Sequence, residues 1–416
     1  MRDLTRRATA YLRNMQALNR NVRLLYLASV FHGTSQGIIS VVFSLFVLSL
    51  GVGADVLGGI LSASPLAQAV GSIPAGFLAE TIGFRSSLLL IYGVSGLAQL
   101  AQYATSSVPL IGMAAFVTGL ALSGDFVVRL PFLAANSEPS QRATVFSVSS
   151  LLFSLSVSLG ALIAGYLPTA LLRVVPDLTE AYRYTLYIAG ALDMLAVLPC
   201  LGTRDLMQKE RRKISFRPYL WGMDRFTLQQ AIVSLFVGLS AGTIMSFASV
   251  LFVYKLGTAR EFFGTVAALS IIPVTLGAVA APKVAQRLGS VPAVTWLRLA
   301  IPASLATLAW TSSSIVGMGA YWAQRVLFMM SQPLSFAFAM DAAGQKSKAP
   351  VSAWLNVTFW LGNAIAAPVA GAFVAQNNYA LPLLMSGAAA VLAAICNQVF
   401  FGPVEARMKQ EVDLGR

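Results

Sequence analysis

The stretch that decides the fold is LFVLSLGVGADVLGGILSASPLAQAVGSIPAGFLAETIG, residues 45–83. Shifted by 206 positions without a gap, it lies over LFVYKLGTAREFFGTVAALSIIPVTLGAVAAPKVAQRLG, residues 251–289. The two segments share eleven identities, and four of these are glycines in one register. An apolar composition alone does not readily align glycines in this way, so the pattern indicates an internal repeat.

Apolar residues dominate the whole chain, of which 57% is hydrophobic and 11% is charged. Soluble domains carry about 25% charged residues, so the excess apolar surface indicates a bilayer as the solvent. A spanning helix needs roughly 20 apolar residues, and period-2 alternation typical of strands is lacking. We therefore expect an all-α integral membrane protein with twelve transmembrane helices, at residues 24–50, 54–79, 86–106, 108–135, 143–167, 182–201, 228–255, 261–286, 290–311, 314–340, 350–375 and 379–402.

A polar, basic segment separates the sixth and seventh apolar runs. The expected organisation is a basic N-terminal segment at 1–23, a six-helix half at 24–201, a linker at 202–227, a second six-helix half at 228–402 and a tail at 403–416. Two parallel six-helix repeats are typical of proteins that bind a solute between their halves, near the midplane of the membrane. Rocking of one half against the other then exposes the solute to either side.

Basic residues gather on one side of the expected bundle. If the N-terminus is inside, 22 of the 29 Lys and Arg residues fall on the inner side, in the termini, the linker and the inner loops. This asymmetry follows the positive-inside rule, so both termini are expected to be cytoplasmic. The protein itself is expected in the inner membrane of a cell. The net charge of +13 is then a signal of topology, and we expect no binding of nucleic acid.

The loop after the second apolar run, GFLAETIGFR at 76–85, carries a family pattern. Together with the twelve helices and the repeat, this loop resembles the major facilitator superfamily, and the resemblance covers residues 22–402. Thr81 and Phe84 replace basic residues of the family pattern. The resemblance implies that the loop and its counterpart in the second half lock the cytoplasmic side of the outward-facing state. The matching residues of this gating loop are Gly76, Glu80, Gly83, Arg85, Arg287 and Gly289.

Charged residues also occur inside the expected spans. In SGDFVVRLPF, residues 123–132, Asp125 and Arg129 lie four positions apart on one helical face, with the acid first, which is the favourable order. A bare charge at the bilayer centre costs about 2.5–3.5 kcal/mol, so this face is expected to point into the protein or a wet cavity. The resemblance implies that helices 1, 4, 7 and 10 line that cavity. The candidate cavity residues are His32, Gln36, Asp125, Arg129, Gln324 and Arg325.

Each candidate also has a structural interpretation. Arg129 either contacts the solute or braces Asp125, and His32 either titrates or packs as a hydrogen-bonded histidine. Asp193 and Arg298 lie on helices that are peripheral in the family, so we expect them to be structural. Pro131 is expected to kink the fourth helix.

The exits of the fourth and tenth helices have similar sequences, in which a proline is followed by an acidic and then a basic residue. We expect these charges to form contacts that break when the cytoplasmic side opens. The candidate gate charges are Glu138, Arg142, Asp341 and Lys346.

No phosphate-binding loop and no Cys/His cluster is found in the sequence, so we expect no cofactor, no metal and no enzymatic activity. The leading hypothesis is a monomeric secondary transporter that moves a small solute by alternating access, with coupling to protons left open. Two arginines in the expected cavity favour an organic anion or a zwitterion. Proton-coupled efflux of hydrophobic compounds or drugs is the first alternative, although the Gly-Pro signature of such antiporters is lacking in helix 5. A non-transporting membrane sensor or scaffold is the second.

Overall fold

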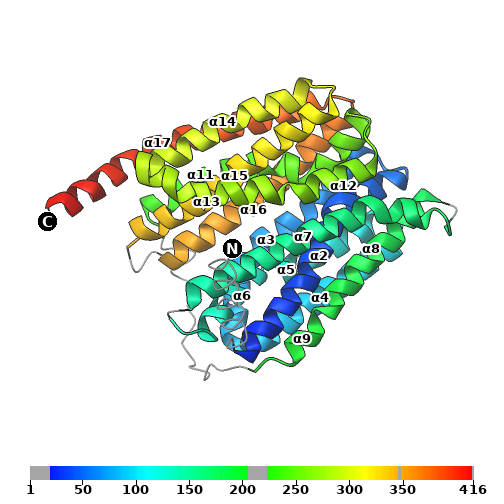
Figure 1. Cartoon of the computed structure of the whole chain (residues 1–416), viewed down its shortest axis with the longest axis horizontal. Helices are drawn as coiled ribbons and strands as arrows, with labels where there is room; N and C mark the ends of the chain where they lie inside the picture. Colours follow the sequence, from blue (N-terminus) through cyan, green and yellow to red (C-terminus); the bar gives the residue numbers. More distant parts are fainter. Residues whose placement is uncertain (1–18, 140, 176, 205–222, 345–347, 415–416) are drawn as a thin grey trace, which may run out of the picture.

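The computed structural model describes residues 19–139, 141–175, 177–204, 223–344 and 348–414 (Figure 1). Most of the predicted N-terminal segment and linker therefore lies outside the described residues. The first half contains α2 (Arg20–Ser49), α3 (Ala54–Ile82), α4 (Phe84–Ala104), α5 (Val108–Leu122), α6 (Asp125–Ala135), α7 (Arg142–Leu171), α8 (Leu178–Leu195) and α9 (Val197–Leu201). The second half contains α11 (Arg225–Val250), the π-helical turn η1 (Leu251–Lys255), α12 (Arg260–Leu269), α13 (Ile271–Leu288), α14 (Ser290–Trp310), α15 (Ser314–Ala342), α16 (Lys348–Val374) and α17 (Ala380–Leu414).

Eleven helical spans in the described ranges are long and apolar enough to cross a membrane. The twelfth long helix is α15, whose hydropathy is lowered by Gln324 and Arg325 in its centre. The prediction of an all-α, twelve-helix membrane fold is therefore confirmed. A helix with polar groups in its middle needs protein or water beside it, so α15 belongs inside the bundle.

The fourth membrane span is interrupted at Ser123 and Gly124, between α5 and α6. Pro131, where we expected a kink, lies further along the span, inside α6. The Ser123 hydroxyl donates to the Leu120 carbonyl oxygen at 2.7 Å, a local bond that competes with the helical ladder. The interruption makes Asp125 the first residue of a new helix, where the helix dipole favours a negative charge.

The sequence repeat is also a structural repeat with the same offset. The helix α3 covers 54–82 and the α12–α13 span covers 260–288, while α4 and α14 both have 21 residues and begin 206 positions apart. The chain turns at Gly51 (φ 79°) and Gly83 (φ 86°), and again at Gly257 (φ 63°) and Gly289 (φ 93°). Positive φ angles favour glycine, which explains why these residues match between the halves.

The two halves meet at one end of the bundle, which we call the distal end. It carries the loop residues 50–53, 172–175, 177, 256–259 and 375–379, while the start of α2 lies at the opposite, proximal end (Figure 1). The helix α12 packs closely on α7, whereas α13, which continues the same span toward the proximal end, makes few contacts with α7. Hydrogen bonds between the halves also gather distally and join Ser44 to Ser246, Tyr166 to Thr265, Thr169 to Glu261, and Arg260 to Tyr182.

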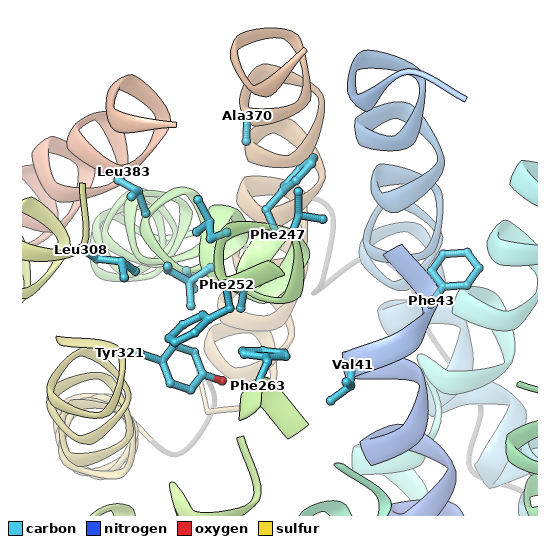
Figure 2. Close-up of a cluster of buried hydrophobic side chains, with 14 of the residues drawn as sticks. Val41, Phe43, Phe247, Phe252, Phe263, Leu308, Tyr321, Ala370 and Leu383 are labelled. Carbon is cyan, nitrogen blue, oxygen red and sulfur yellow. The ribbon is translucent and has the colours of Figure 1, made fainter. Parts of the chain in front are cut away.

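Apolar packing continues across the same end of the molecule. The largest buried cluster includes Val41 and Phe43 of α2 together with Phe252 and Phe263 of the second half (Figure 2). The rings of Phe252 and Phe263 lie 5.0 Å apart, and both contact Tyr321 of α15. The described conformation is thus closed at the distal end.

Two glycine contacts bring the halves together at this end. Gly58 of α3 lies against Gly371 of α16, and Gly264 of α12 lies against Gly165 of α7. The two contacts are equivalents under the 206-residue offset, because 58 corresponds to 264 and 165 to 371. Small residues allow such close helix approach within membranes.

We expect Gly58→Ala to lower the melting temperature of the purified protein. A Cβ atom at this position would lie 2.6 Å from the Ala367 carbonyl oxygen, and overpacking of this kind costs about 1–3 kcal/mol. Gly59→Ala is the matched control, because a Cβ there meets nothing within 4 Å. Equal melting temperatures for the two variants would contradict the close contact.

Candidate functional site

Asp125 is held by groups from two helices. Its carboxylate lies 3.4 Å from the Arg129 guanidinium one turn later, and it accepts a hydrogen bond from the Tyr92 hydroxyl of α4 at 3.1 Å. Both charged residues are buried, each with 6% of its surface exposed. The predicted pair therefore forms and faces the protein interior, as the cost of a bare charge in hydrocarbon requires.

Asp193 of α8 is the centre of a second buried group and has no exposed surface. One of its carboxylate oxygens lies 2.8 Å from His32 Nδ1 of α2. The other accepts from the Ser95 hydroxyl at 3.1 Å and from the Gln99 amide at 2.7 Å, both on α4. Three polar neighbours from two helices thus compensate the burial of one carboxylate.

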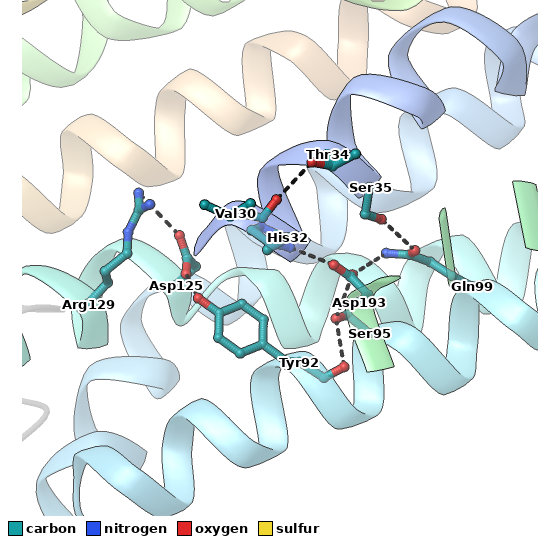
Figure 3. Close-up of polar contacts among 10 residues, drawn as sticks. All are labelled: Val30, His32, Thr34, Ser35, Tyr92, Ser95, Gln99, Asp125, Arg129 and Asp193. Atoms are coloured by element: carbon teal, nitrogen blue, oxygen red, sulfur yellow. Dashed lines mark hydrogen bonds and ion pairs between the residues drawn. The ribbon is translucent and has the colours of Figure 1, made fainter. Parts of the chain in front are cut away.

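The two groups lie side by side and form what we call the N-half network: His32, Tyr92, Ser95, Gln99, Asp125, Arg129 and Asp193 (Figure 3). The His32 and Tyr92 rings are 5.2 Å apart. Phe153 of α7 lies 5.0 Å from the Arg129 guanidinium and 6.0 Å from the His32 ring, so it covers both.

The charges of the N-half network do not balance when His32 is neutral. Two carboxylates then face one guanidinium, which leaves one negative charge without a cation in the network. One bound proton removes that imbalance, and imidazole is the side chain that gains a proton most readily near neutral pH. The arrangement is therefore chemically suited to bind and release a proton.

Sequence reasoning placed His32, Asp125 and Arg129 among the cavity candidates, and the structure brings these three together. The pairing of His32 with Asp193 was not predicted from the sequence, because the two residues are 161 positions apart. The available signal was that both are polar residues in the middle of apolar helices, at similar depth. Gln36 does not join this network, and its buried Nε2 atom has no hydrogen-bond partner among the described residues.

The polar residues of α15 differ in burial and in the hydrogen-bond partners that they have. Gln324 is buried, with 4% of its surface exposed. Arg325 is half-buried, lies 5.8 Å from the Tyr321 ring centre, and has an Nε atom without a hydrogen-bond partner in the described part of the chain. The same holds for Nε2 of Gln332, two turns further along the helix. These groups retain hydrogen-bonding capacity that another molecule can use.

The predicted gating loop turns at Gly83, and Arg85 donates to the Leu201 carbonyl oxygen at 2.9 Å. Leu201 ends α9, and a cation is favourable at a helix C-terminus. Gly76 lies in α3 beside Val127 of α6. Arg287 is exposed, Gly289 forms the equivalent turn, and the Glu80 side chain is not among those described.

At the equivalent turn in the second half, a glutamate of α17 caps the N-terminus of α14. Glu405 accepts from the backbone amides of Ser290 and Val291, at 2.7 and 3.1 Å. This carboxylate satisfies amides that have no partner within α14.

The candidate gate charges Glu138, Arg142 and Asp341 are exposed at the proximal end, and Lys346 lies outside the described residues. The charged side chains that do form hydrogen bonds between the halves, among the described residues, are Arg260 and Glu261 at the distal end. Nothing in the sequence pattern singled out these two residues, because charges at the start of a span usually face water.

Comparison with known proteins agrees with this architecture. A family model described as Major Facilitator Superfamily matches residues 25–217. The first half of the chain is thus similar to this superfamily. A mutant of the nucleoside transporter NupG is similar over 92% of this chain and 100% of its own, with a TM-score of 0.77 and 12% identity.

Two other solved structures share the fold. A D-xylose–proton symporter matches over 91% of this chain and 96% of its own, with a TM-score of 0.72 and 15% identity. A bacterial homologue of the human lysosomal transporter Spinster, in an inward-facing conformation, matches over 93% and 96%, with a TM-score of 0.69 and 17% identity. A search of curated protein sequences gave no significant match. The family supports secondary transport in general, by a multi-pass membrane protein.

A double-mutant cycle tests whether Asp125 and Arg129 act as one structural unit. We expect Asp125→Asn and Arg129→Met each to lower the melting temperature strongly, because breaking a buried ion pair costs about 3–5 kcal/mol. The double variant should be destabilised by clearly less than the sum of the two. Additive losses would show that the two side chains do not depend on each other.

Proposed function

We propose that this protein is a secondary transporter that moves a small solute with an anionic group, either an organic anion or a zwitterion, by alternating access. The observation that carries the proposal is the state of Arg325. It lies in the middle of α15, is half-buried, and forms no ion pair with a carboxylate in the described part of the chain. A guanidinium in that position is well suited to bind a carboxylate or phosphate through two parallel hydrogen bonds.

Neutral hydrogen-bonding groups accompany this cation. Gln332 lies on the same side of α15 as Arg325, since seven residues make nearly two helical turns. Gln36 on α2 of the other half also has an unused amide nitrogen. A solute bound between the halves would then be contacted by both of them, which is the arrangement that alternating access needs.

We further propose that transport is coupled to protons through the N-half network. One proton balances the charges of Asp125, Arg129 and Asp193, and His32 is the group placed to accept it. The network lies in one half and Arg325 in the other. The solute and the proton would therefore act on opposite halves, so that movement of one half against the other depends on both.

The charge distribution supports a placement in the inner membrane with both termini cytoplasmic. The distal end then faces outward, and the described conformation is closed to the outside. We propose a monomer with the two halves at 24–201 and 228–402 as its functional units.

The first test is a thermal-shift screen of a solute library on the purified protein, because a ligand stabilises the state that it binds. The stabilising solute is then measured for transport in proteoliposomes, with and without an imposed pH gradient. We expect Arg325→Gln to raise the KM for this solute about 10- to 100-fold, because hydrogen bonds to charged groups contribute about 1.5–3 kcal/mol.

The exposed Arg173 of the distal loop supplies the control, and Arg173→Gln should transport like the parent. Unchanged transport of an anion by Arg325→Gln would contradict the anion site. Transport restricted to uncharged hydrophobic compounds would instead establish the efflux alternative. Rates unaffected by the pH gradient would contradict proton coupling.

A further inference from the structure

Arg298 of α14 is a buried cation that the proposed transport site does not use. Only 3% of its surface is exposed. Its terminal nitrogens lie 3.2 Å from the Ser335 hydroxyl and 3.5 Å from the Asn397 side-chain oxygen, on α15 and α17. Its Nε atom has no hydrogen-bond partner among the described residues.

Both partners of Arg298 are neutral. Asn397 is held in place by its own amide, which donates to the Val291 carbonyl oxygen and the Thr295 hydroxyl, and its oxygen is thereby turned toward the guanidinium. In the described part of the chain no carboxylate forms an ion pair with Arg298. A buried cation without an anion is costly in a membrane, and such groups usually pair.

The repeat allows the surroundings of Arg298 to be compared with the equivalent positions in the first half. Under the 206-residue offset, Arg298 corresponds to Tyr92, Ser331 to Asp125 and Ser335 to Arg129. The first half therefore places an acid and a base at these positions, and their charges cancel. At the three corresponding positions the second half has a single cation, Arg298 on α14, and it has serines at the positions of both the acid and the base.

We propose that Arg298, Ser335 and Asn397 form a binding site for a small monovalent anion. The guanidinium supplies the charge and at least one unused donor, and the Ser335 hydroxyl can rotate to donate to an anion as well. The anion takes the electrostatic role that Asp125 has in the first half. It is either an inorganic anion of chloride size or the carboxylate of an organic acid.

This site is separate from the proposed solute contact at Arg325. Ser335 follows Arg325 by ten residues, which is about 15 Å along α15. The inference does not depend on the proposed function, because it rests on the charge of the C-terminal half and on its comparison with the N-terminal half.

The test measures the melting temperature of the purified full chain at constant ionic strength while gluconate is replaced by another anion. The probes are chloride, bromide, nitrate, acetate and formate. We expect a saturable rise of a few degrees with at least one of them, because binding to the folded state stabilises it. A response to halide or nitrate assigns an inorganic anion, whereas a response to acetate and formate alone assigns a carboxylate.

Two variants locate the effect. Arg298→Gln should lose the anion-dependent rise. Ser331→Asp restores an acid at the position of Asp125, so it should be more stable than the parent in gluconate and should no longer respond to the anion. The control Arg173→Gln, at an exposed arginine of the distal loop, should respond like the parent.

The proposal is overturned if the parent responds to none of the five anions, or if Arg298→Gln responds as the parent does. If Arg298→Gln does not fold, Ser331→Asp decides the question alone. A parent-like rise in this variant would overturn the proposal, and a lost rise with higher stability in gluconate would support it.

Discussion

A charge inside a bilayer needs a partner within the protein, and this constraint explains the polar interior of the molecule. Lipid supplies no counterion, and a bare charge costs about 2.5–3.5 kcal/mol on insertion scales. In the first half, Asp125 pairs with Arg129, and Asp193 receives hydrogen bonds from three side chains. Helices far apart in sequence are therefore fixed relative to one another by a few buried ions. In the described part of the second half, neither Arg298 nor Arg325 forms an ion pair with a carboxylate, which is why we place anion binding there.

Two close helix–helix contacts join the halves, and we call them seams. The repeat makes the two seams equivalent in backbone geometry, but their side chains differ. The contact of α3 with α16 and the contact of α12 with α7 are equivalents, each built on a pair of glycines. On α7, Tyr166 and Thr169 bind the hydroxyl of Thr265 and the carboxylate of Glu261. The corresponding residues are Ala372 of α16 and Ala375, which directly follows this helix. One seam is thus held by polar contacts that water can replace, and the other by apolar packing.

The sequence predicted the fold well because helix length and glycine spacing are local properties. Glycines such as Gly51 and Gly257 indicated the offset of 206 residues in the sequence. In the structure these glycines form paired turns with positive φ. Partners across the bundle were harder to predict. The contact of His32 with Asp193 depends on how α2 and α8 rotate about their axes, which one sequence does not fix. The interruption at Ser123 and Gly124 was also missed, because proline is the stronger signal and a Ser-Gly pair usually passes unnoticed within a helix.

The central claim is that the halves open alternately around their buried polar groups. Spin labels test it in lipid bilayers, on a background with Cys200→Ala and Cys396→Ala. One labelled pair, Glu138→Cys with Asp341→Cys, spans the proximal end, and a second, Val174→Cys with Gln376→Cys, spans the distal end; all four positions are exposed. The pH is varied between about 5 and about 8, the range in which histidine changes charge. We predict that the pH change alters both label distances, in opposite senses: the proximal distance shortens where the distal distance lengthens. Distances that stay fixed at both ends, at each pH and with the stabilising solute, would contradict the account.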